Sequence, residues 1–115
     1  MKILVVDDDP AIRMLYKEEL EDEGYEVVVA SSGKEALELF EKESPDLVTL
    51  DILMPDMDGI QVLRKMKEMR PRLPIIMSTA YDYRDDFAVW ASEAYVVKSS
   101  DTTELKETIR RLLQK

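Results

Sequence analysis

Apolar residues in this chain follow two alternating patterns. Five short runs are almost entirely apolar and span residues 3–6, 26–30, 47–50, 75–78 and 94–97. In most of the segments between and after them, apolar residues recur three or four positions apart, the spacing of an amphipathic helix. A run without polar alternation is typical of a strand that is buried on both faces, as in parallel sheets. The alternation therefore predicts an α/β fold in which helices cover both faces of a parallel sheet.

Capping residues indicate where the predicted helices begin. Three starts carry such residues: Asp9 with Pro10, Ser32 with Glu35, and Asp101 with Glu104. The third helix is expected after the turn at 56–59, and the segment 81–92 is interpreted as a loop with a short helix. The residues expected to face the core lie on one side of each helix: Ile12, Leu15, Tyr16 and Leu20; Ala36, Leu37 and Phe40; Val62, Leu63 and Met66; and Leu105, Ile109, Leu112 and Leu113.

Length and charge then exclude several classes of protein. With 115 residues the chain is long enough for one core and too short for two, so a single domain over residues 1–115 is expected. The formal net charge of -9 argues against nucleic-acid binding by this chain alone, because phosphate groups need a basic surface. The first apolar run is too short for a signal-peptide core or a membrane span, so we expect a cytoplasmic protein without membrane contact.

The chain contains neither cysteine nor histidine. Disulfides, ordinary zinc sites, thiol nucleophiles and Ser-His-Asp triads are therefore excluded. Chemistry in this chain must rely on carboxylates, hydroxyls and lysine. Oxygen ligands of this kind select hard cations, so Mg2+, or alternatively Mn2+, is the expected metal.

Polar side chains follow four of the five predicted strands: Asp7 and Asp8, Asp51, Thr79, and Lys98. In an open α/β sheet the ligand crevice lies at the carboxyl ends of the strands, so these groups are expected at one edge. Each has an ordinary structural role when taken alone, such as a turn cap, a strand-end hydroxyl or a solvated surface charge. Their joint placement is what favours a shared site.

Three converging carboxylates need a counter-charge to stay ionised. At about 4 Å and an effective dielectric near 20, each pair repels by roughly 4 kcal/mol. Lys98 is expected to supply one positive charge and a divalent cation the second. A carboxylate beside a cation and an ammonium group is suited to accept a phosphoryl group as an acyl phosphate, with Thr79 donating a hydrogen bond to it.

These motifs resemble a known family. In order along the chain, VVDDDP, TLDILMPDMDG, MSTA and YVVK are similar to the motifs of the response regulator receiver domain of two-component signalling, the CheY-like family. The resemblance covers the whole chain. It implies a flavodoxin-like fold, doubly wound, with a five-stranded parallel sheet in the order 2-1-3-4-5 and five helices. It also implies a phosphoacceptor signalling switch whose only chemistry is its own phosphorylation and dephosphorylation.

The resemblance assigns roles to the acidic residues. Asp51 matches the phosphorylated aspartate, and Asp7 and Asp8 match the acidic pair of the metal site. Asp8 and Asp51, together with the backbone carbonyl of Leu53, are expected to ligate Mg2+. The phosphoryl donor implied by the family is a histidine kinase or phosphotransfer protein, which agrees with the absence of histidine here. A further protein target is expected downstream.

The remaining family residues belong to the switch. Thr79 matches its hydroxyl, Lys98 its conserved lysine, and Tyr95 the aromatic side chain that turns inward on activation. The family usually has a proline after this lysine, joined by a cis peptide, whereas Ser99 follows here. A non-proline cis peptide costs about 3 kcal/mol, so either a strained cis bond or a trans bond with a rearranged loop is expected.

Two further features are specific to this chain. The segment from Thr79 to Lys98 is shorter than usual, and Trp90 within it fits either a core position or a partner-binding face. Leu53 and Tyr81 stand two residues after Asp51 and Thr79, where they flank the path of the attacking water in this family. Because both are bulky, we expect them to slow hydrolysis of the acyl phosphate.

Three other functions fit the same topology. A Mg2+-dependent aspartyl-phosphate phosphatase usually needs a second aspartate two residues after the nucleophile, where this chain has Leu53. A receiver-like interaction module that is never phosphorylated is expected to lack an acidic residue or the lysine, and none is missing. A flavin or nucleotide binder needs a glycine- or hydroxyl-rich loop after the first strand, where this chain has acids.

Overall fold

Five parallel strands form the central sheet of the structure. It is a computed structural model that describes residues 1–51, 54, 56, 58–79, 94–97 and 101–113, with backbone alone for residues 79, 94, 95 and 97. The strands are β1 (Lys2–Val6), β2 (Glu26–Ala30), β3 (Leu47–Leu50), β4 (Ile75–Thr79) and β5 (Ala94–Val97). Their order is β2-β1-β3-β4-β5, and every neighbouring pair is parallel. The predicted fold class and strand order are therefore confirmed.

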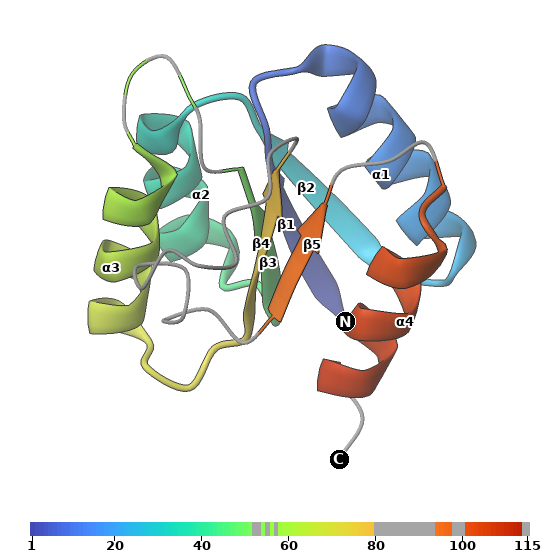
Figure 1. Ribbon diagram of the computed structural model, residues 1–115. Helices are drawn as coiled ribbons and strands as arrows, with labels where there is room; N and C mark the ends of the chain where they lie inside the picture. Colours follow the sequence, from blue (N-terminus) through green and yellow to red (C-terminus); the bar gives the residue numbers. More distant parts are fainter. Residues whose placement is uncertain (52–53, 55, 57, 80–93, 98–100, 114–115) are drawn as a thin grey trace.

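Two layers of helices enclose this sheet (Figure 1). The described helices are α1 (Pro10–Asp22), α2 (Gly33–Glu43), α3 (Gly59–Met69) and α4 (Thr103–Leu113). Helices α2 and α3 cover one face, and α1 and α4 cover the other, as a doubly wound sheet requires. The additional short helix predicted within 81–92 lies outside the described residues.

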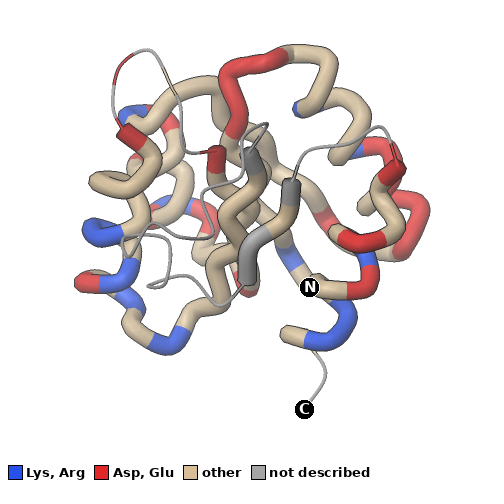
Figure 2. Tube along the Cα trace, in the orientation of Figure 1, with Lys and Arg blue, Asp and Glu red and all other residues tan. Residues whose placement is uncertain are grey.

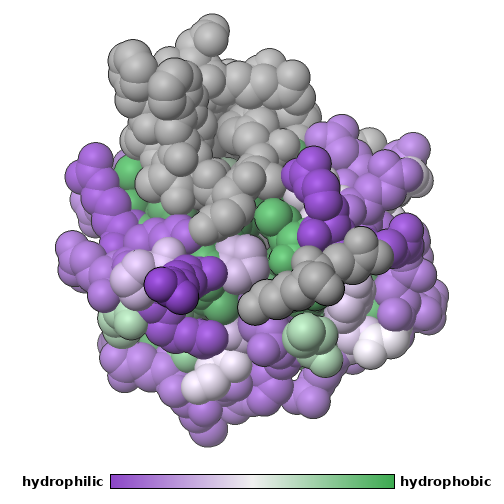
Figure 3. Space-filling view, turned by 90° about the horizontal axis from the view of Figure 1, so that it is seen from below, coloured by the Kyte–Doolittle hydropathy of each residue, from purple (hydrophilic) through white to green (hydrophobic). Residues whose placement is uncertain are grey.

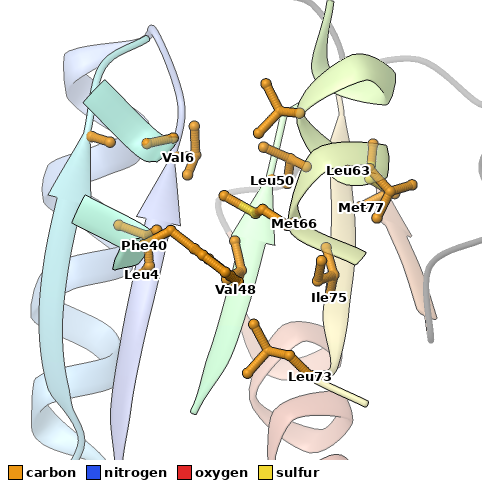
Figure 4. Close-up of a cluster of buried hydrophobic side chains, with 13 residues drawn as sticks. Leu4, Val6, Phe40, Val48, Leu50, Leu63, Met66, Leu73, Ile75 and Met77 are labelled. Atoms are coloured by element: carbon orange, nitrogen blue, oxygen red, sulfur yellow. The ribbon is translucent and has the colours of Figure 1, made fainter. Parts of the chain in front are cut away.

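The strands lack polar alternation because apolar side chains pack against both faces of the sheet. Leu4 and Val6 of β1 belong to the core beneath α2 and α3, together with Phe40, Val48, Leu63 and other apolar side chains (Figure 4). The intervening β1 residues, Ile3 and Val5, belong instead to the core beneath α1 and α4. Successive residues of a strand point to opposite faces, so a strand buried on both faces is apolar at most of its positions.

One buried polar contact joins α1 to β4. The hydroxyl groups of Tyr16 and Ser78 lie 2.9 Å apart, and both residues are almost fully buried, at 2% exposure each. The sequence pattern placed Tyr16 on the buried side of its helix but gave no sign of a polar partner. Ser78 directly precedes Thr79 at the carboxyl end of β4.

Removing this hydrogen bond is expected to destabilise the fold. Tyr16→Phe keeps the ring and leaves the Ser78 hydroxyl buried without that bond, which should lower the free energy of unfolding by about 1–3 kcal/mol. Chemical denaturation of Tyr16→Phe, Ser78→Ala and the double variant gives the comparison. The double variant should lose less than the sum of the single losses, because both remove the same bond. Additive losses would show that the two hydroxyls do not interact.

The helix starts follow the predicted capping residues with two shifts. Asp9 accepts the Ala11 N–H, and Ser32 accepts the Glu35 N–H, as expected. The Glu35 carboxylate, however, accepts the N–H of Ser31, one residue before the expected partner. At α4 the carbonyl of Thr102 accepts the first helical hydrogen bond, from Lys106, so Thr102 and not Asp101 occupies the N-cap position.

Asp101 still caps this helix from one position further out. Its carboxylate accepts hydrogen bonds from both the N–H and the hydroxyl of Thr103, at 2.9 and 2.6 Å. These bonds hold the pKa of the Asp101 carboxyl below its ordinary value. The Thr102 hydroxyl is thereby left to bond Glu19 of α1, at 3.0 Å, and so joins the two helices on this face.

The surface fits the acidic composition. Seen from the end of the sheet where β1 begins, the described surface is mostly hydrophilic, with small hydrophobic areas between the polar side chains (Figure 3). None of the helices that the structure describes has the length and apolar character that a membrane span requires.

Candidate functional site

Asp7 and Asp51 lie side by side because their strands are paired. The register of β1 and β3 sets Val6 opposite Leu50, so the residue after each strand lies at the same edge. The ladder continues one step further: Asp51 donates its N–H to the Val6 carbonyl at 3.0 Å, and Asp7 donates its N–H to Ala30 at 3.1 Å. Both side chains are almost fully buried, with 1% exposure for Asp7 and 3% for Asp51.

The loop from Asp7 into α1 is fixed by its own hydrogen bonds. The Asp7 carboxylate accepts the N–H of Asp9 at 2.9 Å, and the Arg13 guanidinium donates to the Asp7 backbone carbonyl at 2.7 Å. Asp9 in turn caps α1 by accepting the N–H of Ala11. Asp8 is therefore held between two anchored residues, with its side chain exposed to solvent.

These three carboxylates form one cluster. One oxygen each from Asp7, Asp8 and Asp51 lies within 4.8 Å of the others. Figure 2 shows the red acidic segments that lead into α1 and follow β3 close together at the upper end of the sheet. At this separation a pair of carboxylates repels by roughly 3 to 4 kcal/mol at an effective dielectric near 20, and less where water screens Asp8.

The cluster fits a hard divalent cation. Mg2+ is bound in proteins by a few carboxylates together with water, and it offsets the mutual repulsion of such groups. Two of the three carboxylates, those of Asp7 and Asp51, come from positions fixed by the sheet, and the third, that of Asp8, is accessible to water. The predicted convergence of Asp7, Asp8 and Asp51 at one edge of the sheet is thus found in the structure.

The connection after Asp51 is anchored at several points. Met54 packs against the core beneath α2 and α3, and Asp58 caps α3 by accepting the Ile60 N–H. Asp56 accepts hydrogen bonds from Gly33 and Lys34 at the start of α2. Sequence reasoning placed Asp56 in a turn and missed this contact, because its partners are 23 and 22 residues away.

Other predicted site residues are described only in part or not at all. The register of β3 and β4 pairs Leu50 with Met77, and that of β4 and β5 pairs Thr79 with Val97. The Thr79 backbone therefore ends its strand at the same edge of the sheet as the cluster. The side chains of Thr79 and Tyr95 lie outside the described part of the chain, and their roles stay predictions. The remaining predictions also fall outside the described residues: Leu53, Tyr81, Trp90, Lys98 and the Lys98–Ser99 peptide.

Sequence comparison identifies the known proteins that this chain resembles. Residues 3–110 match the family model described as the response regulator receiver domain. The alkaline phosphatase synthesis transcriptional regulatory protein PhoP of Bacillus subtilis is 37% identical over 99% of this chain. The match covers 49% of PhoP, so the chain spans about half the length of that relative.

Comparison with solved structures also finds response regulators. Response regulator protein TrrA from Thermotoga maritima, solved in complex with Mg(2+)-BeF, has a TM-score of 0.94 and is 49% identical. That alignment covers 97% of this chain and 98% of the TrrA chain. A structure of histidine kinase ThkA in complex with TrrA gives a TM-score of 0.92 at 48% identity, covering 98% of each chain.

Proposed function

Because this chain belongs to the response regulator receiver domain family, we propose that Asp51 accepts a phosphoryl group from a histidine kinase or phosphotransfer protein. The reaction requires a divalent cation, Mg2+ or alternatively Mn2+, held by Asp7, Asp8, Asp51 and the backbone carbonyl of Leu53. Residues 1–115 act as one receiver domain. A downstream protein target responds to the phosphorylation state of this domain.

The approach of three carboxylates from two strands carries this proposal. One carboxylate oxygen of each residue lies within 4.8 Å of the others, an arrangement that costs free energy unless a cation or a bound proton offsets the repulsion. Buried acids of this kind concentrate at functional sites. The TrrA structure with Mg(2+)-BeF supports the choice of cation. The complex of ThkA with TrrA supports a histidine kinase as partner.

Asp51 is the nucleophile in the proposed reaction. One of its carboxylate oxygens attacks the phosphorus of the donor phosphohistidine. The new O–P bond forms an aspartyl phosphate as the P–N bond to the imidazole breaks, and the imidazole nitrogen takes up a proton from water. The backbone hydrogen bond from Asp51 to Val6 holds the proposed nucleophile at the end of β3, which supports this role because a fixed nucleophile loses less entropy on reaction.

The other proposed site residues and the cation balance the negative charge at the site during this step. Asp7 and Asp8 hold the cation beside Asp51. Lys98, which matches the conserved lysine of the family, pairs with the transferred group in this proposal. Mg2+, when bound, neutralises charge on the equatorial oxygens of the phosphoryl group. Catalysis is limited to phosphorylation and dephosphorylation of the domain itself.

Phosphorylation then switches the domain between two packings. The new group adds about -1.5 to -2 charge and three acceptor oxygens beside Thr79 and Lys98. Thr79 moves toward these oxygens and donates a hydrogen bond, which opens space for Tyr95 to turn inward. The phosphorylated state therefore favours a different surface on the elements around β5.

Phosphate uptake from a small donor tests this function. Wild-type protein is incubated with acetyl phosphate and Mg2+, and its intact mass is measured with and without excess chelator. We expect the mass to increase by one phosphoryl group only when Mg2+ is free in solution. No increase with Mg2+, or an equal increase in the chelated sample, would contradict the proposal.

The bulky residues at positions 53 and 81 are proposed to set the lifetime of the phosphorylated state. Leu53→Ala and Tyr81→Ala are each expected to accelerate dephosphorylation, because removal of the side chain opens a path for water to the acyl phosphate. We expect an increase of up to about tenfold, which corresponds to a barrier lowered by up to roughly 1.4 kcal/mol. The measurement is loss of phosphate after the donor is removed. Unchanged rates in both variants would exclude this role.

A further inference from the structure

An arginine of α1 holds the loop that carries two of the three clustered carboxylates. The Arg13 guanidinium donates a hydrogen bond to the backbone carbonyl of Asp7 at 2.7 Å. The backbone N–H of Arg13 also bonds the carbonyl of Asp9, at 3.1 Å. Arg13 therefore contacts the loop at both of its ends, where β1 finishes and where α1 is capped. Asp8 lies between these two contacts.

The contacts restrict where the Asp8 carboxylate can lie. A further hydrogen bond closes the loop on itself, because the Asp7 carboxylate accepts the N–H of Asp9 at 2.9 Å. A loop this short, with both ends held, has few conformations left. The Asp8 side chain is exposed and has little packing to order it. The restriction on its backbone therefore decides which positions its carboxylate can reach.

Arg13 binds this loop without entering the acidic cluster. Its side chain is partly buried, and its guanidinium bonds a neutral carbonyl oxygen. Among the described residues, Arg13 forms no salt bridge with a carboxylate. A guanidinium between the carboxylates would compete with a divalent cation for the same oxygens. Bound to a carbonyl instead, Arg13 orders the loop without taking up a carboxylate oxygen.

We infer that Arg13 is a positioning residue for the cluster of Asp7, Asp8 and Asp51. By holding the loop on α1 before a cation arrives, it spares cation binding the entropy of ordering Asp8. Arg13 touches neither the cation nor the phosphoryl group, and it acts through the backbone of the loop. The inference rests on the proposed function, because that function supplies the cation. Arg13 lies outside the four motifs that carry the family resemblance.

The charge of Arg13 and its bond to the loop have opposite effects on cation binding. A positive charge beside Asp7 repels a divalent cation, so removing the charge alone should strengthen Mg2+ binding slightly, and salt screens this effect. Losing the bond to the Asp7 carbonyl should weaken Mg2+ binding. Groups that orient metal ligands from outside usually change affinity by about 10- to 100-fold. The loss of positioning is therefore expected to exceed the effect of charge.

The affinity for Mg2+ alone tests this role. Titration calorimetry compares wild type with Arg13→Met, which keeps a long apolar stem but removes the charge and the donor groups. Lys17→Met is the matched control. Lys17 lies one turn further along α1, and its ammonium group pairs with Glu21 at 2.7 Å. Both variants remove one positive charge from the same helix, and only the first removes a contact with the loop.

Arg13→Met is expected to weaken Mg2+ binding by about tenfold, whereas Lys17→Met should change it by less than about twofold. The initial rate of phosphorylation by acetyl phosphate should fall in Arg13→Met at low Mg2+ and recover at saturating Mg2+. Chemical denaturation in chelator shows that each variant is folded.

A third variant separates geometry from charge. Arg13→Lys keeps the positive charge but replaces the planar fork by a flexible ammonium group. Its Mg2+ affinity should be at least about twofold weaker than that of wild type and higher than that of Arg13→Met. Because the charge is unchanged, this loss cannot come from electrostatic repulsion of the cation. Arg13→Lys also serves as the test if the methionine variant fails to fold.

Several results would overturn the inference. These are Arg13 variants that bind Mg2+ as tightly as wild type, an equal loss of affinity in Lys17→Met, and a phosphorylation rate that stays low at saturating Mg2+. A wild-type protein that binds Mg2+ and gains phosphate, with the Arg13 variants unchanged, removes the inference and leaves the proposed function standing. A wild-type protein that does neither removes both.

Discussion

Replacing Asp51 by asparagine is expected to abolish phosphate uptake from acetyl phosphate in the presence of Mg2+. The amide has almost the same size as the carboxylate but lacks the anionic oxygen that attacks phosphorus. Because only the nucleophile is removed, the fold should be retained. Intact mass measurement after incubation should show the phosphoryl group on wild type and none on the variant.

The same substitution should stabilise the protein without Mg2+. Asp51 lies with Asp7 and Asp8 in a cluster of carboxylates within 4.8 Å. Neutralising one member reduces the repulsion, so the free energy of unfolding should rise by about 1–3 kcal/mol in chelator. An Asp51→Asn variant that still gains phosphate, or that loses stability in chelator, would contradict the roles given to this cluster.

Asp8→Asn is expected to weaken Mg2+ binding by at least roughly tenfold. Asp8 is the exposed member of the cluster, so its amide can be hydrated and the fold should be little changed. Thermal unfolding gives the measurement: Mg2+ at 100 times its dissociation constant should stabilise wild type by about 2.7 kcal/mol. At the same concentration the variant should gain only about 1.4 kcal/mol or less, because its affinity is at least roughly tenfold lower.

The control for this prediction is Asp22→Asn. Asp22 is exposed at the end of α1 and the substitution makes the same change in net charge. Its response to Mg2+ should equal that of wild type. A similar loss of the Mg2+ effect in both variants would mean that the cation acts through the overall negative charge and not through the cluster.

Much of this fold follows from local patterns in the sequence. The run Leu47–Leu50 is apolar except for Thr49 because β3 is buried on both faces, and its place between β1 and β4 puts Asp51 at the end of the sheet where the strands finish. Asp9 and Pro10 mark the start of α1 because capping is decided within one turn of helix. Features of this kind depend on residues that are neighbours in the sequence, so they can be predicted from the sequence alone.

Contacts between distant segments were not predictable in the same way. The hydroxyl pair of Tyr16 and Ser78 depends on how α1 lies across β4, and a tyrosine on a buried helix face has many possible partners. Asp56 lies beside the start of α2 only because β1 and β3 are neighbours in the sheet. The sequence pattern identifies such residues as polar, and the tertiary structure decides their partners.

Locating the phosphorylated residue tests the central claim most directly. Borohydride reduces an aspartyl phosphate to homoserine, and peptide mapping of the reduced protein then identifies the position that carried the phosphate. After reaction with acetyl phosphate and Mg2+, we expect homoserine at position 51 alone. Homoserine at position 7 or 8, or none at any position of a protein that bound Mg2+, would contradict the assignment of Asp51 as the acceptor.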